Sequence, residues 1–314
     1  MLTNPHRFTA AVALAAAPAL AIQPSTTPAD QPADAPPAEL TPESSAPTFT
    51  ASIAGWHAFD SDLDTGPGEL SLSRLRLDLS AGFDLAERRT LVVGIEAEET
   101  WYDFTNATGL DASGDPFDNA TSVDLFARYS APLNETTTWF GVATVGFAAE
   151  SGADFSDSLV YGGALGFSYR HSDTFSWGLG VAVRTRLEDD ALIIPLPQIR
   201  AKLSERWTLA SERAGLRLEY AASDSLAYGL AAQYDSRTFR LDDGGPIPSG
   251  VATDRRVPVA FFARYSPDRN IDLTAQIGAS LFTNIELFDA NGNDLTDDDA
   301  DAALFAGLSA RVRF

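Results

Sequence analysis

Residues 271–281 read IDLTAQIGASL, and their side chains alternate between apolar and polar or small types. Ile271, Leu273 and Ile277 share one parity, whereas Asp272 and Gln276 share the other. Successive side chains of a β-strand point to opposite sides, so a period of two predicts a strand and does not fit a helix. The stretch therefore predicts a strand with one apolar face and one polar face.

The same alternation recurs from about residue 49 to the end of the chain, broken by Gly, Asp, Asn, Pro and Ser. About thirteen segments show it, and single-chain bacterial barrels have an even number of strands. We therefore expect an all-β fold, an antiparallel up-and-down transmembrane β-barrel of about 12 strands, within a range of roughly 10 to 14. Region 188–213 is ambiguous, because Pro195, Pro197 and the polar break at 204–206 obscure where strands end.

The connections between these segments differ in length in a regular way. Short ones lie near 85–89, 132–136, 171–174, 222–225 and 267–270, and long ones near 61–68, 106–119, 150–157, 242–254 and 289–300. An up-and-down barrel places tight turns on one rim and larger loops on the other, which produces this alternation. A β-sandwich gives no reason for it.

The two faces of the segments differ in chemistry. Aromatic residues lie at or near the ends of the apolar faces, namely Phe83, Tyr129, Trp139, Tyr169, Trp177, Tyr220 and Tyr265. Such rings settle at membrane interfaces. The polar faces carry a charged series that we expect to line a water-filled lumen: Arg74, Arg76, Glu96, Glu98, Arg128, Arg170, Arg184, Arg186, Arg217, Arg264, Arg311 and Arg313. Buried in a soluble core, so many arginines would be costly.

Two features bear on the interior. Glu96 and Glu98 share the polar face of the strand that should form a hairpin with Arg74 and Arg76, so opposite charges should lie near one another. Twelve strands tilted by about 40° give a backbone radius of about 12 Å. Side chains then leave either a narrow passage or a plugged interior.

The final segment, residues 304–314, alternates Leu, Ala and Val with small or charged residues and stops at Phe314. It resembles the terminal strand of bacterial outer-membrane barrels, whose last aromatic residue is recognised by the barrel-assembly machinery. Residues from about 190 to 314 also resemble an uncharacterised bacterial outer-membrane β-barrel family, a domain of unknown function. The resemblance implies the fold, an outer-membrane location in a Gram-negative-type envelope and an assembly role for Phe314, but no activity.

Two segments precede the alternating region. Residues 1–21 combine a weakly basic start, an apolar run and Ala19-Leu20-Ala21, the pattern of a cleaved signal peptide. Residues 22–48 are rich in proline, alanine and acidic residues, which predicts a disordered linker. The barrel is expected over 49–314.

Composition excludes several classes of function. The net charge of −22 argues against nucleic acid as a partner, and the absence of cysteine removes disulfides and thiolate metal sites. Only three histidines occur, and the His171-Ser172-Asp173 run fits a turn better than a catalytic triad. We expect no enzyme activity, no cofactor and no metal centre.

The acidic loops leave one further hypothesis open. Residues from Asp289 match the start of an EF-hand loop, but Asp294 and Ala300 stand where that motif needs glycine and a bidentate acid. Acidic residues in two long loops could instead loosely bind divalent cations that bridge lipopolysaccharide, namely Asp242, Asp243, Asp297, Asp298, Asp299 and Asp301.

The function that fits best is a monomeric, porin-like outer-membrane barrel surrounded by lipid and lipopolysaccharide. It would be either a narrow pore for passive diffusion of small solutes and ions or a structural barrel. Two alternatives are a soluble secreted β-sandwich that binds a sugar or a surface partner, and a barrel enzyme. Aqueous solubility without detergent would favour the sandwich.

Overall fold

A computed structural model describes residues 46–314 of the chain. The predicted signal peptide, 1–21, and residues 22–45 of the predicted linker lie outside these described residues. The strands are β1 Thr48–Asp62, β2 Glu69–Leu85, β3 Arg89–Thr105, β4 Asn119–Pro132, β5 Thr137–Ala149, β6 Leu159–Arg170, β7 Phe175–Arg186, β8 Asp189–Lys202, β9 Trp207–Glu212, β10 Gly215–Ala221, β11 Leu226–Gln233, β12 Asp235–Arg240, β13 Val251–Tyr265, β14 Ile271–Phe288, β15 Asp294–Ala300 and β16 Ala303–Arg313.

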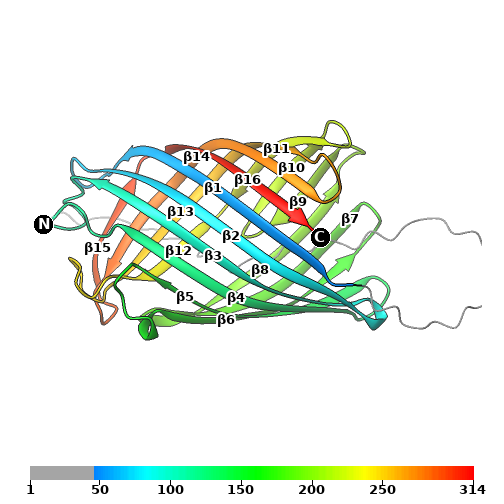
Figure 1. The fold of residues 1–314 in the computed structure, drawn as a ribbon, viewed down its shortest axis with the longest axis horizontal. Coiled ribbons are helices and arrows are strands. Elements are labelled where there is room, and N and C mark those ends of the chain that lie inside the picture. Colours follow the sequence, from blue (N-terminus) through cyan, green and yellow to red (C-terminus); the bar gives the residue numbers. More distant parts are fainter. Residues whose placement is uncertain (1–45) are drawn as a thin grey trace, which may run out of the picture.

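The strands form one closed antiparallel barrel (Figure 1). Strands β1 to β11 each pair with the next strand in sequence, and β16 pairs with β1 to close the wall. β11 and β12 both pair with β13, and β15 and β16 both pair with β14, so each couple is one interrupted strand. The described residues thus form a 14-stranded barrel, at the upper end of the predicted range.

The additional strand comes from a segment that the sequence pattern presents as continuous. Residues 206–221 form two strands, β9 and β10, which pair with each other across a turn at Arg213 and Ala214. Both prolines of the ambiguous region lie inside β8.

The two rims differ as the connection lengths predict. Short turns join the strands at one end, the first at 86–88 and the last at 266–270. Phe49 and Phe314 also lie at this end and hydrogen-bond to each other through their backbones. Loops 63–68, 106–118, 150–158 and 241–250 lie at the other end. The expected long loop at 289–300 is wrong in extent, because β15 occupies most of it and pairs with β14.

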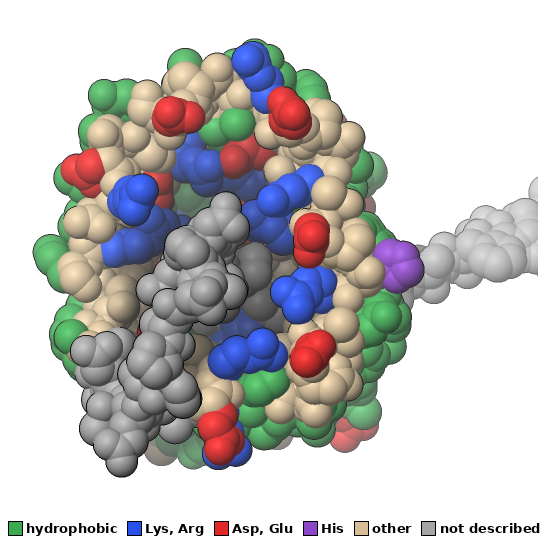
Figure 2. Space-filling view, turned by 90° about the vertical axis from the view of Figure 1, so that its right-hand side faces the viewer, with side chains coloured by type: hydrophobic (Ala, Val, Ile, Leu, Met, Phe, Trp, Pro, Cys, Tyr) green, Lys and Arg blue, Asp and Glu red, His purple; other side chains and the backbone are tan. Residues whose placement is uncertain are grey.

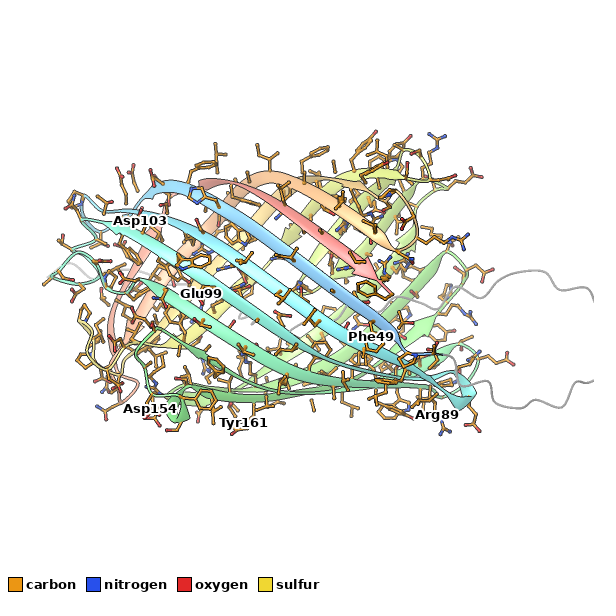
Figure 3. The ribbon with its side chains drawn as sticks, in the orientation of Figure 1. Phe49, Arg89, Glu99, Asp103, Asp154 and Tyr161 are labelled. Atoms are coloured by element: carbon orange, nitrogen blue, oxygen red, sulfur yellow. The ribbon has the colours of Figure 1, made fainter. Side chains whose placement is uncertain are left out.

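The alternating faces lie on opposite sides of the wall. On β7, Trp177, Leu179, Val181 and Val183 are each more than 40% exposed, whereas Ala182 between them is 2% exposed. Figure 3 shows such side chains projecting from the outside of the barrel, Tyr161 among them. Near the short-turn end, aromatic rings contact one another along neighbouring strands, as in Tyr129 with Trp139 and Trp207 with Tyr220. The outer surface therefore has an apolar belt with an aromatic border.

The barrel is pinched toward its long-loop end. β12 leaves the line of the wall and pairs with β5 through Arg240 and Ala149, which lie far apart in strand order. Inside this narrowed part, buried apolar side chains form a cluster that we call the apolar plug, with Leu70, Leu72, Tyr102, Phe104, Leu110, Phe117, Phe239, Leu241, Ile285 and Leu287 among its members. The interior is thus filled with apolar side chains at this end.

Candidate functional site in the barrel interior

Below the apolar plug, three arginines and three acids form a buried group that we call the ion-pair cluster: Arg74, Glu98, Asp235, Arg237, Asp254 and Arg256. Arg74 lies at its centre. Its Nη1 donates to Asp235 Oδ2 at 2.6 Å, its Nε lies 3.4 Å from Glu98 Oε1, and its Nη2 lies 3.6 Å from Asp254 Oδ2. The side chain of Arg74 is 3% exposed, so these charges interact with little solvent screening.

The remaining contacts complete the ion-pair cluster. Arg237 donates to both carboxylate oxygens of Glu98, at 2.5 and 2.7 Å, and also bonds Asp235. Arg256 donates twice to Asp254 Oδ1, at 2.9 and 2.6 Å, and Tyr102 Oη donates to Asp254 Oδ2 at 2.9 Å. Three positive and three negative side chains balance formally, which is the condition under which charges tolerate burial.

The ion-pair cluster bridges the bore. Arg74 and Glu98 belong to the adjacent strands β2 and β3, whereas the other four residues belong to β12 and β13. β2 and β13 are separated in strand order by β14, β16 and β1, so these contacts cross the interior. Tyr102 links this layer to the apolar plug, because its ring stacks on Phe239 at 5.9 Å. The direct route along the barrel axis is therefore occupied by side chains.

The short-turn end is different. Figure 2 shows this face hollowed, with Lys and Arg side chains gathered around the opening. Arg217 bonds Glu212 and lies 3.6 Å above the Phe262 ring, and Arg264 bonds Glu219 at 2.6 Å. We call this hollow, with its arginines and their acidic partners, the charged vestibule.

The other predicted lining residues take several positions. Arg76 pairs with Glu96, as their place in the β2–β3 hairpin predicts, and Arg184 lies 3.7 Å from Asp124. The remaining residues lie outside these pairs: Arg128 over the Phe140 ring, Arg186 bonded to the Asp190 carbonyl, Arg313 paired with Asp272, Arg311 opposite Asp272 in the β14–β16 register, and Arg170 at the short-turn rim bonded to the Glu135 carbonyl.

A polar pocket of about 200 Å³ adjoins the ion-pair cluster. It lies between β12 on one side and the long-loop ends of β4 to β8 on the other, and Arg213 of the β9–β10 turn also lines it. Arg76, Glu96 and Arg184 face it together with Leu192. Since it lies beside the closed axis, between β12 and the wall strands, we call it the side pocket.

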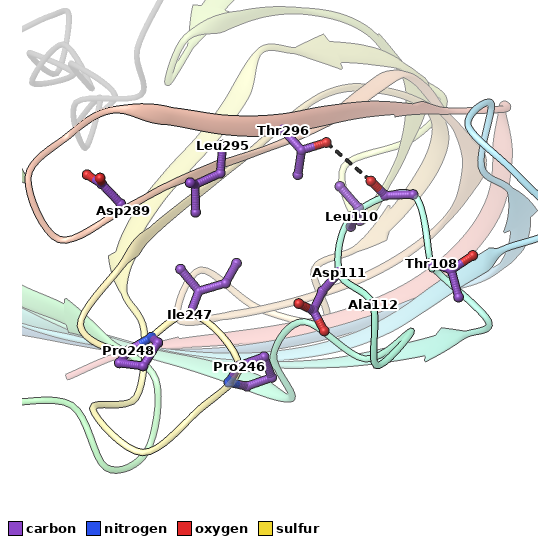
Figure 4. A pocket seen from close by; sticks show the side chains of 11 residues that line it. Thr108, Leu110, Asp111, Ala112, Pro246, Ile247, Pro248, Asp289, Leu295 and Thr296 are labelled. Atoms are coloured by element: carbon purple, nitrogen blue, oxygen red, sulfur yellow. Dashed lines mark hydrogen bonds between the residues drawn. The ribbon is translucent and has the colours of Figure 1, made fainter.

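A second hollow of about 520 Å³ lies among the loops at the long-loop rim (Figure 4). Leu110, Ile247 and Leu295 line it, and Thr296 Oγ1 donates to the Gly109 carbonyl at 3.2 Å. Glu150 ties neighbouring loops together by accepting from the backbone N–H groups of Asp118 and Asp242. Burial raises the pKa of the Glu150 carboxyl, although both hydrogen bonds oppose this shift.

No group of three or more acidic or histidine residues within 46–314 is arranged to hold a metal ion. Asp297, Asp298 and Asp299 lie in β15 instead of a free loop, and Asp298 is 2% exposed and accepts from the Thr65 N–H. The cation hypothesis for the acidic loops therefore gains no support. His57 lies exposed against Phe59, and His171 lies in a turn. No helix of the described chain is long and apolar enough to span a membrane.

Sequence reasoning identified Arg74 and Glu98 of the ion-pair cluster as lumen-lining residues, but not the four residues that reach them across the bore. Asp235, Arg237, Asp254 and Arg256 come from β12 and β13, and nothing local relates them to β2. A signal for the apolar plug does exist. Leu70, Leu72, Tyr102 and Phe104 have the parity of the polar faces of their strands, near the long-loop ends. On two paired strands, these apolar residues occupy positions whose side chains otherwise face the polar interior. Such a pattern indicates that water is excluded from this part of the interior.

Comparisons with solved structures match barrels of the outer membrane. The COG4313 outer membrane channel from Pseudomonas putida F1 is similar with a TM-score of 0.46 and 13% identity, over 88% of this chain and all of that chain. The P. putida toluene transporter TodX is similar with a TM-score of 0.43 and 11% identity, over 87% and 91% of the two chains. The KdgM porin, solved with disordered oligogalacturonate, has a TM-score of 0.35 and 11% identity, over 84% and 99%.

No curated protein sequence matches the chain. A family match covers residues 71–311, which is a longer region than the sequence resemblance from about 190 to 314. It includes all six residues of the ion-pair cluster, which come from β2, β3, β12 and β13. The chain belongs to the family described as a domain of unknown function, DUF6268.

Proposed function

We propose that the protein is a monomeric outer-membrane β-barrel that provides a narrow, largely closed passage for small solutes. Its apolar belt with an aromatic border would contact lipid and lipopolysaccharide, and its short-turn end would face the periplasm. Phe314, which is 74% exposed beside the first strand, would be available to the barrel-assembly machinery.

The observation that carries the proposal is the ion-pair cluster that bridges β2 and β3 to β12 and β13. Above it, the apolar plug fills the axis, while below it a charged vestibule opens. The side pocket adjoins the ion-pair cluster through Glu98 and Arg237 and the apolar plug through Phe239. Solutes would therefore pass beside the closed axis through a space lined by arginines and acids, so only small ones would pass.

Single-channel recording in planar lipid bilayers tests the proposal. We expect a small conductance and, in Arg184→Gln, a shift of the reversal potential toward cation preference, because a lining positive charge is removed. Arg89→Gln is the matched control, since Arg89 lies exposed at the short-turn rim. A large conductance typical of an open bore would contradict the closed axis, and complete absence of conductance would favour a purely structural barrel.

A further inference from the structure

The barrel wall lacks backbone pairing along one stretch. β8 pairs with β9 only through Arg200, Ala201 and Lys202, and the β9–β10 hairpin then turns back at Arg213. Beyond this turn the next strand in the wall is β12, which leans inward and pairs with β5 through Arg240. Within the described chain, no ladder joins the rest of β8 to β12.

Two prolines fit this open edge. The Ile199 N–H donates to Ser211 Oγ at 3.0 Å, so it points toward the β9 side of β8. In an antiparallel strand, alternate residues direct their N–H groups to the same side. Positions 197 and 195 would therefore direct theirs to the same edge, but both are proline and carry no N–H. Prolines are confined to edges of sheets for this reason, so the sequence itself marks β8 as an edge.

The side pocket lies directly behind the open edge. Leu192 of β8, Arg213 of the hairpin turn and Ser236 and Thr238 of β12 all line it. Arg213 is the cation with spare donors: it lies 3.8 Å from Glu96 Oε1 and makes no hydrogen bond within residues 46–314. By contrast, Arg237 is held by Glu98 and Asp235.

The outer surface beside the edge is apolar. Ile193 of β8 is 67% exposed, Leu216 of β10 is 50% exposed, and Leu230 of β11 is 54% exposed. These residues belong to the apolar belt that the proposed function places in lipid. A molecule reaching Arg213 from this side would need an apolar body in contact with the belt and an anionic end, since a guanidinium binds carboxylates and phosphates well.

We propose that the side pocket opens laterally between β8 and β12 and binds a single-chain anionic amphiphile from the surrounding membrane. The head group bonds Arg213, and the chain extends past Ile193 toward the lipid. This inference rests on the proposed membrane placement, but it does not require that the barrel conduct ions.

Calorimetric titration of the full-length protein in non-ionic detergent tests the site, with sodium decanoate as the amphiphile and sodium butyrate as a head group without a long chain. We expect decanoate to bind and butyrate to bind at least about tenfold more weakly, because a chain of six more methylenes adds apolar contact. Arg213→Gln should weaken decanoate binding by about tenfold or more.

Arg88→Gln is the matched control, because Arg88 is also exposed with a positive φ, 58° against 51° for Arg213, but lies in the β2–β3 turn at the opposite rim. A second pair of variants tests the lateral opening itself. Ser236→Trp fills the pocket behind the edge and should abolish binding, whereas Ser309→Trp, on β16 away from the edge, should retain it.

Absence of decanoate binding to the folded protein would overturn the inference. So would equal affinity for butyrate, or equal effects of Arg213→Gln and Arg88→Gln. A protein that binds decanoate through Arg213 but shows no bilayer conductance would overturn the passage and leave the amphiphile site intact, so the two proposals fail separately.

Discussion

Arg74 shows how a charge is accommodated deep inside this barrel. Its guanidinium contacts three carboxylates, donates to Thr100 Oγ1 at 2.9 Å and lies 4.7 Å from the centre of the Trp56 ring. An arginine removed from water needs such a set of partners, because an isolated buried charge is strongly unfavourable. The same partners depend on Arg74 in turn.

Replacing Arg74 with methionine should therefore destabilise the barrel severely. Glu98, Asp235 and Asp254 would lose a shared positive partner, which in buried pairs costs about 3–5 kcal/mol. Urea unfolding in detergent micelles, followed by tryptophan fluorescence, measures the loss.

Arg264→Met is the control for that measurement. Arg264 pairs with Glu219 near the mouth and its side chain is 33% exposed, so solvent should limit the loss to about 0–1 kcal/mol. Similar losses in the two variants would show that the ion-pair cluster is no more important to stability than a rim contact.

Residue pairing could be predicted from the sequence only where it is local. Arg76 and Glu96 lie on neighbouring strands of one hairpin, so alternation and a short turn place them together. Arg74 and Asp235 are 161 residues apart, and their contact depends on how far β12 leans into the bore. No pattern within either strand encodes that displacement.

At the scale of elements, β8 departs most from a regular wall strand. Its prolines made strand and loop hard to distinguish in the sequence, yet the structure shows an uninterrupted strand from Asp189 to Lys202. The ambiguity has a physical cause. Proline is excluded from the middle of a sheet but is tolerated on an edge, and a closed barrel is expected to have no edge.

Restoring backbone N–H donors at the open edge of β8 should destabilise the protein. In the double variant Pro195→Val and Pro197→Val, two N–H groups would point into the unpaired edge, and each unpaired donor away from water costs about 1–3 kcal/mol. The free energy of unfolding in detergent is the quantity to measure.

Pro132→Val provides the comparison, because Pro132 is the last residue of β4, at the short-turn rim, where water can satisfy a new N–H group. Its effect should stay below about 1 kcal/mol, the usual contribution of proline to the entropy of the unfolded chain. A double variant at 195 and 197 that is no less stable than Pro132→Val would mean that β8 has no open edge.

The ends of the strands followed the alternation closely. Which of the two alternating sets of side chains faces outward was harder to predict. On β14 most apolar residues have odd numbers, from Ile271 to Leu281 and again at 285 and 287, yet Ile285 and Leu287 are fully buried while Ile277 is 63% exposed. Phe282 lies between them with a positive φ of 53° and is 80% exposed. One irregular residue reverses which side faces outward, and the sequence shows it only as the apolar Phe282 and the polar Thr283, each at the opposite parity to its type in the rest of the strand.

For the whole molecule, the fold was predictable because every level of the sequence agreed with it. Alternation, the contrast between short and long connections and the aromatic borders each predict a membrane barrel, and the observed wall has all three. The closed axis was not predictable in the same way. It arises from the displacement of β12 and from loop 106–118, which contributes Leu110 and Phe117 to the interior.

The fold also makes a prediction about the isolated protein. A closed ladder resists mild detergent, so the unheated protein should migrate faster on a gel than the boiled protein, as one compact chain per micelle. A protein that shows no mobility difference and stays in aqueous solution without detergent would contradict the placement of the apolar belt in a membrane.

The pairing of β1 with β16 has a consequence for biogenesis. β1 is sealed by β16, which follows all the other described strands in chain order, so the ring cannot shut until β16 has been synthesised. Premature stop codons anywhere downstream of β2 should thus yield open sheets with two sticky margins, prone to aggregation and degradation, instead of smaller functional cylinders.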